Sequence, residues 1–223
     1  MLTQIKKEFN SKFTTNSSSV YISDNMSGKM SGVPAISTNN LLNPFCNARK
    51  NNPDYICNKC FADKTVNRYS ALRDNLTANY LTLTGSVLPF DELPIFGNVS
   101  FVRLEAFGDL ANVTQAINYI NIAYKNPSVT FTIWTKNYNI LDQAITAYGK
   151  PDNLICILSS IKLNQIDAAY KKYSWIDHVF TVYTPGYIAD NNVDINCGAR
   201  SCVSCRRCYD RSNKDFFISE QLK

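Results

Sequence analysis

The sequence has a single histidine, His178, among 223 residues. One histidine excludes HExxH and Cys2His2 zinc sites, and any Ser-His-Asp triad would have to include His178. Charged residues make up only 18% of the chain, which is not the profile of a highly charged disordered protein. No apolar run approaches the roughly 18 residues of a membrane span. The segment 1–13 has no apolar run after its lysines, so we expect no secretion signal, no membrane contact and a cytoplasmic location.

Hydrophobic residues make up 45% of the chain, enough for one domain, or one domain with a small appendage. The net charge of +5 is mildly basic, and part of the excess is local. The segment Arg200–Lys214 carries five basic residues against one acidic residue, Asp210. This segment is either a solvated tail or a surface that binds nucleic acid or a nucleotide through its phosphates.

The chain contains eight cysteines, and seven of them fall into two groups. The first group has the spacing C-x10-C-x2-C and ends in CNKCFA; it consists of Cys46, Cys57 and Cys60. The second group lies in CGARSCVSCRRC; it consists of Cys197, Cys202, Cys205 and Cys208. The eighth, Cys156, lies in the apolar run LICIL and is expected to be a small buried core residue.

Two-residue gaps let successive thiolates converge on one metal or cluster, so both groups are candidate metal sites. A disulfide framework is not expected in a reducing cytosol, although redox-active disulfides are an alternative. Four thiolates would satisfy tetrahedral zinc or hold a [4Fe–4S] cluster. Three thiolates leave one position open for a substrate or cofactor. Zinc with a fourth ligand from elsewhere, or a mixed site using both groups, would also account for the pattern.

From residue 99 onward, strand patterns alternate with helix patterns at intervals of 25 to 30 residues. Strands are expected at 99–106, 129–136, 153–160 and 178–184, and helices at 112–124, 139–148 and 163–173. A weak strand at 32–37, a long helix at 61–83 and a final strand at 214–219 extend the series. We therefore predict an α/β fold with a parallel sheet of five or six βα units, as an open partial barrel or a doubly wound sheet.

Three regions follow from this pattern. Residues 1–30 form a polar lead-in, residues 31–190 form the βα domain with the first cysteine group, and residues 191–223 form a cysteine-rich metal-binding segment.

Polar residues follow each predicted strand, and the carboxyl ends of parallel strands are where chemistry gathers. The candidates at these ends include Glu105, Gly108, Asp109, Lys136 and Ser159. Alternation along the strand also predicts that Arg103 and Glu105 share one face and point towards a pocket. Alternatively, these residues only cap helices or lie in solvent-exposed loops.

Cysteines in the loop after the first strand, ending in CNKCFA and followed by a βα array, resemble the radical S-adenosylmethionine (SAM) superfamily. The resemblance implies that Cys46, Cys57 and Cys60 hold a [4Fe–4S] cluster whose open iron binds SAM. It also implies cofactor contacts from the motif RLEAFGDL, with Glu105, Gly108 and Asp109, and from the neighbouring strand ends. The superfamily's usual spacing is C-x3-C-x2-C, with an aromatic residue before the last cysteine. Here the first gap is ten residues and Phe61 follows the last cysteine.

A second resemblance is to phage-encoded proteins of the gene product 88 type. It rests on ordered short motifs between Ser27 and Tyr209: SGKMSGVPAIS, CNKCFA, FGD, TIWTK and CVSCRRCY. Membership would place the protein in the cytoplasm of a phage host, and it carries no demonstrated reaction.

Two functions are therefore expected. The first is a radical-SAM-like enzyme of unspecified substrate, with one [4Fe–4S] cluster that binds SAM and an auxiliary cluster at the C-terminal cysteines. The second is a non-enzymatic protein, stapled by zinc or iron–sulfur sites, that contacts nucleic acid or a host protein.

Overall fold

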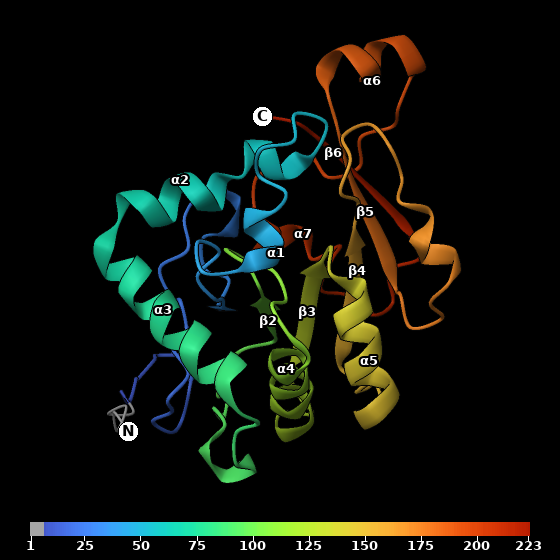
Figure 1. Cartoon of the computed structure of the whole chain (residues 1–223). Helices are drawn as coiled ribbons and strands as arrows, with labels where there is room; N and C mark the ends of the chain where they lie inside the picture. Colours follow the sequence, from blue (N-terminus) through green and yellow to red (C-terminus); the bar gives the residue numbers. More distant parts are fainter. Residues whose placement is uncertain (1–6) are drawn as a thin grey trace.

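The computed structural model describes residues 7–223 and is built around one parallel sheet of six strands (Figure 1). The strands are β1 (Ala35–Ile36), β2 (Phe101–Leu104), β3 (Thr130–Thr135), β4 (Leu154–Ser159), β5 (His178–Tyr183) and β6 (Phe217–Gln221). They pair in chain order from β1 to β6, so the strand order never reverses as it does in a doubly wound sheet. Among the described strands, β1 and β6 do not pair with each other, so no closed barrel forms.

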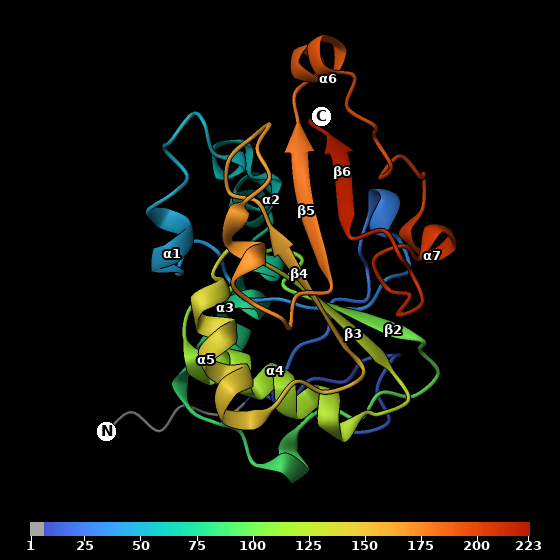
Figure 2. The same cartoon turned by 90° about the vertical axis from the view of Figure 1, so that its right-hand side faces the viewer.

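Three helices cover one face of the sheet: α3 (Ser70–Gly85), α4 (Val113–Lys125) and α5 (Tyr138–Tyr148). Figure 2 shows α4 and α5 on one side of the strands and the C-terminal segment on the other. The main core lies under these helices, where side chains such as Ile120 and Leu141 meet alternate strand residues such as Phe131. Asn112 caps α4 as expected, because its side chain accepts a hydrogen bond from the backbone of Gln115.

The long helix predicted at 61–83 is two helices, α2 (Phe61–Arg68) and α3. The backbone of Tyr69 between them is extended, with φ −114° and ψ 101°, which breaks the helical hydrogen-bond ladder. The break lets α3 pack its buried Leu76 and Leu83 against the core while α2 turns away beside the cysteine loop.

The prediction of a helix at 163–173 is wrong. Only a short 3-10 turn forms, at Ala168–Lys171, and Asn164 adopts a left-handed backbone with φ 62°. Residues 161–163 instead pair with the loop that carries the first cysteine group, through hydrogen bonds of Ile161 and Leu163 to residues 54–56. Tertiary pairing therefore overrides the amphipathic pattern of this segment.

Residues 1–6 of the predicted polar lead-in lie outside the described residues. The rest of it packs onto the domain, because Val20 and Ile22 are buried in the main core. Ser23 forms a bridge to Ala35 of β1 and thereby extends the pairing of the sheet's first strand.

The other face of the sheet is covered by the C-terminal segment from about residue 197, which contains α7 (Cys202–Cys205), while α6 (Pro185–Asn191) projects beyond the carboxyl end of β5 (Figure 2). Tyr209 from this segment stacks on Phe101 of β2, with ring centroids 4.4 Å apart. Thr132 of β3 donates a hydrogen bond to the carbonyl of Cys208 at 3.0 Å. The segment is thus the second layer over the sheet and not a separate tail. Among the described helices, none is long and apolar enough to cross a membrane.

Candidate functional site

The first cysteine group lies at the carboxyl edge of the sheet, in the connection between β1 and α2. Cys46 belongs to the short helix α1 (Pro44–Asn47), Cys57 lies in a 3-10 turn and Cys60 precedes α2. Figure 1 shows α1 towards the end of the sheet at which the arrowheads of the strands lie. Asn43 fixes α1 there, because its side chain accepts from the backbone of Phe45 and donates to the carbonyl of Asp109 at 2.7 Å.

The loop between Cys46 and Cys57 is hydrogen-bonded to the segment that follows β4, at the carboxyl edge of the sheet. Tyr55 forms an isolated bridge with Lys162, which follows β4, and the backbone of Ile56 donates to Ile161 at 3.0 Å. The ten-residue gap that departs from the radical SAM spacing therefore ends at the segment that follows β4.

The three thiols share one electrostatic neighbourhood. Burial raises the pKa of Cys46 far above its usual range, and Asp109 and the other two thiols raise it further, while Lys136 opposes them. Burial also raises the pKa of Cys57, with Lys136 and Arg49 acting in the opposite direction. Without a metal, Cys46 and Cys57 therefore keep their protons more strongly than a free cysteine does. A metal that takes them as thiolates would find two cations nearby to offset the charge.

Asp109 joins the ends of β2 and β3. One carboxylate oxygen accepts hydrogen bonds from the Thr135 hydroxyl and from the backbone of Leu110, and the other accepts from the backbone of Lys136 at 3.0 Å. The residue is buried, with 4% of its surface exposed. Asp109 and Lys136 therefore lie beside the first cysteine group, and the carboxylate of Asp109 is already engaged with its own chain.

Glu105 does not share a face with Arg103, so that expectation is wrong. The backbone of Glu105 is left-handed, with φ 55°, which interrupts the alternation of the strand. Its carboxylate turns to the helix side, where it accepts hydrogen bonds from Thr38, Gln115 and Tyr119. Arg103 points to the other face and lies over the ring of Trp134, 3.9 Å from its centroid.

Burial raises the pKa of Glu105 to about 8, although hydrogen bonds from Tyr119 and Thr38 lower it. The carboxyl group is enclosed, with 2% of the residue exposed. In this conformation Glu105 ties β1, β2 and α4 together. Its partner Thr38 follows β1, and Gln115 and Tyr119 come from α4. Their role was missed, although Gln115 and Tyr119 lie one helical turn apart on α4, a spacing that puts them on one face.

Gly108 lies in the turn after β2, where the backbone runs close to Glu105 and Thr38. A β-carbon at this position would contact the Glu105 carboxylate and would lie 2.9 Å from the Thr38 hydroxyl oxygen. Only glycine fits without a shift of these buried groups. The sequence predicted Gly108 as a cofactor contact, and in the structure it also has this local packing reason.

Replacing Gly108 with alanine is expected to lower the free energy of unfolding by about 1–3 kcal/mol, because the added methyl group overpacks the Glu105 network. Urea denaturation monitored by circular dichroism measures the change. Gly85→Ala at the end of α3 is the control, since a β-carbon there meets nothing within 4 Å. Equal midpoints for the two variants would contradict the overpacking.

Ser159 ends β4 and is buried, with 5% of its surface exposed. The next residue, Ser160, bonds to the hydroxyl of Thr181 on β5 at 2.8 Å and accepts from the backbone of Asp167. These serines thus lie at the same carboxyl edge as Asp109 and Lys136, as expected from the strand-end rule.

The second cysteine group lies against the face of the sheet that the helices leave free. Cys202 and Cys205 are in α7, and the backbone of Cys197 donates to Ser219 of β6 at 2.9 Å. All four cysteines of the group line one pocket of about 30 Å³. Burial raises the pKa of Cys208 to about 12, and the neighbouring thiols raise it further.

Cations and unpaired donors surround this second group. Lys29 donates to the Cys197 sulfur at 3.5 Å and pairs with Glu220. Arg103 lowers the pKa of Cys202 and Cys208 against the effect of burial, and its Nε atom is buried without a hydrogen-bond partner among the described residues. These cations would offset part of the negative charge of the group if its cysteines were thiolates.

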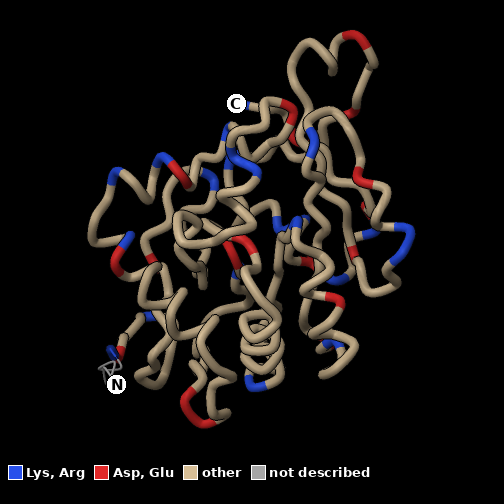
Figure 3. The backbone as a smooth tube through the Cα atoms, in the orientation of Figure 1, with Lys and Arg blue, Asp and Glu red and all other residues tan. Residues whose placement is uncertain are grey.

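The basic segment does not form one uniform patch. Arg206 lies over the ring of Phe101, 5.7 Å from its centroid, and Arg207 pairs with Asp215. Arg211 faces a different pocket at the amino edge of the sheet. Figure 3 shows the basic residues scattered along the chain rather than gathered on one side.

All eight cysteines lie within residues 7–223, and each is free rather than in a disulfide. Cys60 packs against one hydrophobic cluster, and Cys197, Cys202 and Cys208 pack against another, with Met30 packed against both. In this same range, no three histidine, cysteine, aspartate or glutamate side chains are grouped as ligands of one metal ion.

The chain matches the gene product 88 family over residues 10–216. It belongs to the gene product 88 family. The match spans both cysteine groups and five of the six strands, so the resemblance drawn from CNKCFA, FGD and CVSCRRCY is confirmed at the level of this phage-type family. No curated protein and no solved structure matches the chain.

Proposed function

We propose that this gene product 88 protein is an iron–sulfur protein of the radical-SAM-like type. Cys46, Cys57 and Cys60 would hold a [4Fe–4S] cluster with one iron free of protein ligands, and SAM would bind at that iron. When bound, such a cluster supplies an electron to SAM for radical chemistry on a substrate. The observation that supports the proposal is that Cys46 lies within electrostatic reach of Cys57 and Cys60, in the loop that follows β1 at the carboxyl edge of a parallel sheet, where cofactors bind in α/β proteins.

The chain's own residues would support this site in distinct ways. Lys136 and Arg49 offset the negative charge of the three thiolates. Asp109 and Asn43 fix the turn after β2 and the helix α1 against each other. Cys46 is partly buried, which would limit the access of water and oxygen to its sulfur.

The four cysteines of the second group would hold a second metal group that fastens the C-terminal segment to the sheet. Cys197, Cys202 and Cys208 are partly buried and pack against the hydrophobic cluster that contains Phe101 and Trp134, whereas Cys205 is exposed. An auxiliary cluster there would lie on the same domain as the first group. Metal binding would also stabilise the fold, because the four ligands come from α7 and its two flanks.

A second candidate is favoured by the small size of the second pocket. Its volume of about 30 Å³ suits one ion better than a larger group. Four thiolates are a common ligand set for structural zinc. If the first group also holds zinc, both metal ions would be structural and the protein would carry out no radical chemistry. It would then be a binding protein, with nucleic acid or a host protein as its partner.

Anaerobic purification followed by iron, sulfide and zinc analysis and a visible spectrum tests these alternatives. We expect broad visible absorbance and about eight irons per chain, or about four irons with one zinc if the second group binds zinc. A SAM titration of the absorbance or electron paramagnetic resonance signal then reports binding at the open iron. A colourless protein with one or two zincs per chain would overturn the radical-SAM-like proposal.

A further inference from the structure

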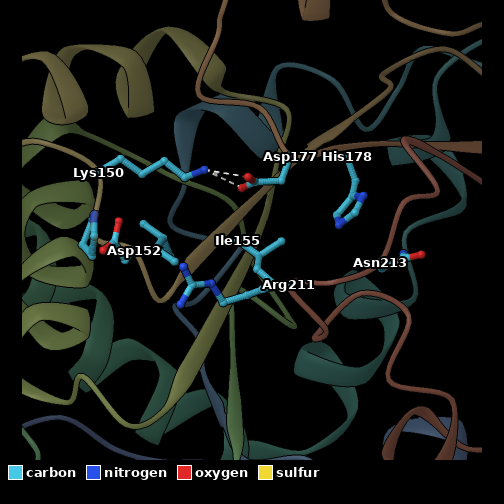
Figure 4. A pocket seen from close by; sticks show the side chains of 9 residues that line it. Lys150, Asp152, Ile155, Asp177, His178, Arg211 and Asn213 are labelled. Carbon is cyan, nitrogen blue, oxygen red and sulfur yellow. Dashed lines mark hydrogen bonds and ion pairs between the residues drawn. The ribbon is translucent and has the colours of Figure 1, made fainter.

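A pocket of about 310 Å³ lies at the amino edge of the sheet, opposite the edge that carries the first cysteine group. It is formed by the turn before β4, the starts of β4 and β5, and the loop that leads from α7 to β6. Its floor is apolar, and its polar lining consists of Lys150, Asp152, Asp177, His178, Arg211 and Asn213. Figure 4 shows these side chains around the space, with Arg211 reaching in from the C-terminal loop.

Part of this lining is already paired. Lys150 donates to both carboxylate oxygens of Asp177, at 2.6 and 2.7 Å, and Asp177 also accepts from the backbone of Cys156. Asn213 is engaged through both its amide and its carbonyl with the surrounding loop. Among the described residues, Arg211 and Asp152 have no ion pair or hydrogen bond, although both line the same pocket.

His178 brings a hydrogen-bond acceptor to the pocket. The residue is buried, with 4% of its surface exposed, and its Nδ1 lies 2.8 Å from the carbonyl oxygen of Asp215. A carbonyl oxygen only accepts, so Nδ1 carries the proton and Nε2 of the neutral ring has a free lone pair. In Figure 4 the ring projects from the start of β5 towards the space beside Ile155 and Arg211.

We propose that this pocket binds a small phosphomonoester that carries hydroxyl groups, of the size of a pentose phosphate. The guanidinium of Arg211 and the remaining N–H of Lys150 would donate to the phosphate oxygens, since a phosphate accepts from several donors at once. The carboxylate of Asp152 and Nε2 of His178 would accept from the sugar hydroxyls. A volume of about 310 Å³ is at the lower end of the range of small-molecule sites.

The test uses tag-free protein, in which His178 is the only histidine, so its imidazole NMR signals need no assignment by mutation. Ribose 5-phosphate is expected to shift these signals and to bind with a Kd below about 1 mM in calorimetry. Inorganic phosphate should bind more weakly because it lacks the hydroxyls of the sugar. Ribose should not bind measurably, because it lacks the charge that Arg211 recognises.

Three variants test what Arg211 and Asp152 each contribute to ligand binding. Arg211→Ala should weaken ribose 5-phosphate binding by about tenfold or more, and Asp152→Asn should weaken it without weakening the binding of inorganic phosphate. Arg200→Ala is the matched control, because Arg200 is an exposed arginine of the same basic segment outside this pocket. No shift of the His178 signals up to about 10 mM ligand, or equal binding by Arg211→Ala and Arg200→Ala, would overturn the proposal. Metal analysis of the two cysteine groups is independent of either result.

Discussion

Replacing Cys60 with alanine is expected to remove about four irons per chain and to abolish SAM turnover, while the domain stays folded. The loss should be complete rather than partial, because a group of three thiolates has no spare ligand. Burial and mutual repulsion raise the pKa of Cys46 and Cys57, so the two remaining thiols hold their protons more strongly than free cysteine does. Iron content by colorimetric assay and SAM consumption by chromatography measure the two effects.

Two further cysteine variants test whether the loss of iron is specific to the first cysteine group. Cys156→Ala makes the same chemical change in the buried core, outside both groups, and should keep the full iron content and activity. Cys205→Ala should remove the metal of the second group alone, since Cys205 is exposed in α7 and lines the second pocket. If Cys60→Ala keeps its iron, or if the wild type holds zinc at this group, the first group is not the site of an iron–sulfur cofactor.

The alternation of strand and helix patterns predicted the sheet well, because each of the strands β2 to β5 is an apolar run bounded by turn signals. The order of the strands could not be predicted from the sequence. The structure has an open sheet with its strands in sequential order, not the doubly wound alternative. The prediction failed at 163–173, where the amphipathic pattern is real but the backbone of Asn164 is left-handed and donates to the carbonyl of Val182 on β5 instead of starting a helix.

The candidate site was predicted in part. The spacing of CNKCFA and the strand-end rule led to Cys46, Cys57, Cys60, Asp109 and Lys136, which the structure brings into one neighbourhood. Alternation misplaced Glu105, because a left-handed residue at the end of a strand leaves no mark in a hydrophobicity pattern. The partners Thr38 and Tyr119 were missed for a related reason. A buried polar network depends on three elements meeting, and each of its residues alone resembles an ordinary surface residue.

Glu105→Ala is expected to lower the free energy of unfolding by about 3–5 kcal/mol. The change leaves the buried hydroxyl of Tyr119, the amide of Gln115 and the hydroxyl of Thr38 without their shared acceptor, and it leaves a cavity. Urea unfolding monitored by circular dichroism measures the loss. A loss below about 1 kcal/mol would show that the network relaxes around the missing carboxyl group.

Glu105→Gln tests the charge rather than the packing. Burial raises the pKa of Glu105 to about 8 in the folded protein, whereas the unfolded chain releases this proton near 4.5. Between these pH values the folded state binds more protons than the unfolded state, so the wild-type stability should fall as the pH rises, by up to about 1.4 kcal/mol per pH unit. The glutamine variant cannot titrate and should lack this slope. Its stability relative to the wild type should therefore improve from pH 5 to about pH 8. Parallel curves for the two proteins over this range would mean that Glu105 is ionised in the fold, with its charge stabilised by Tyr119, Gln115 and Thr38.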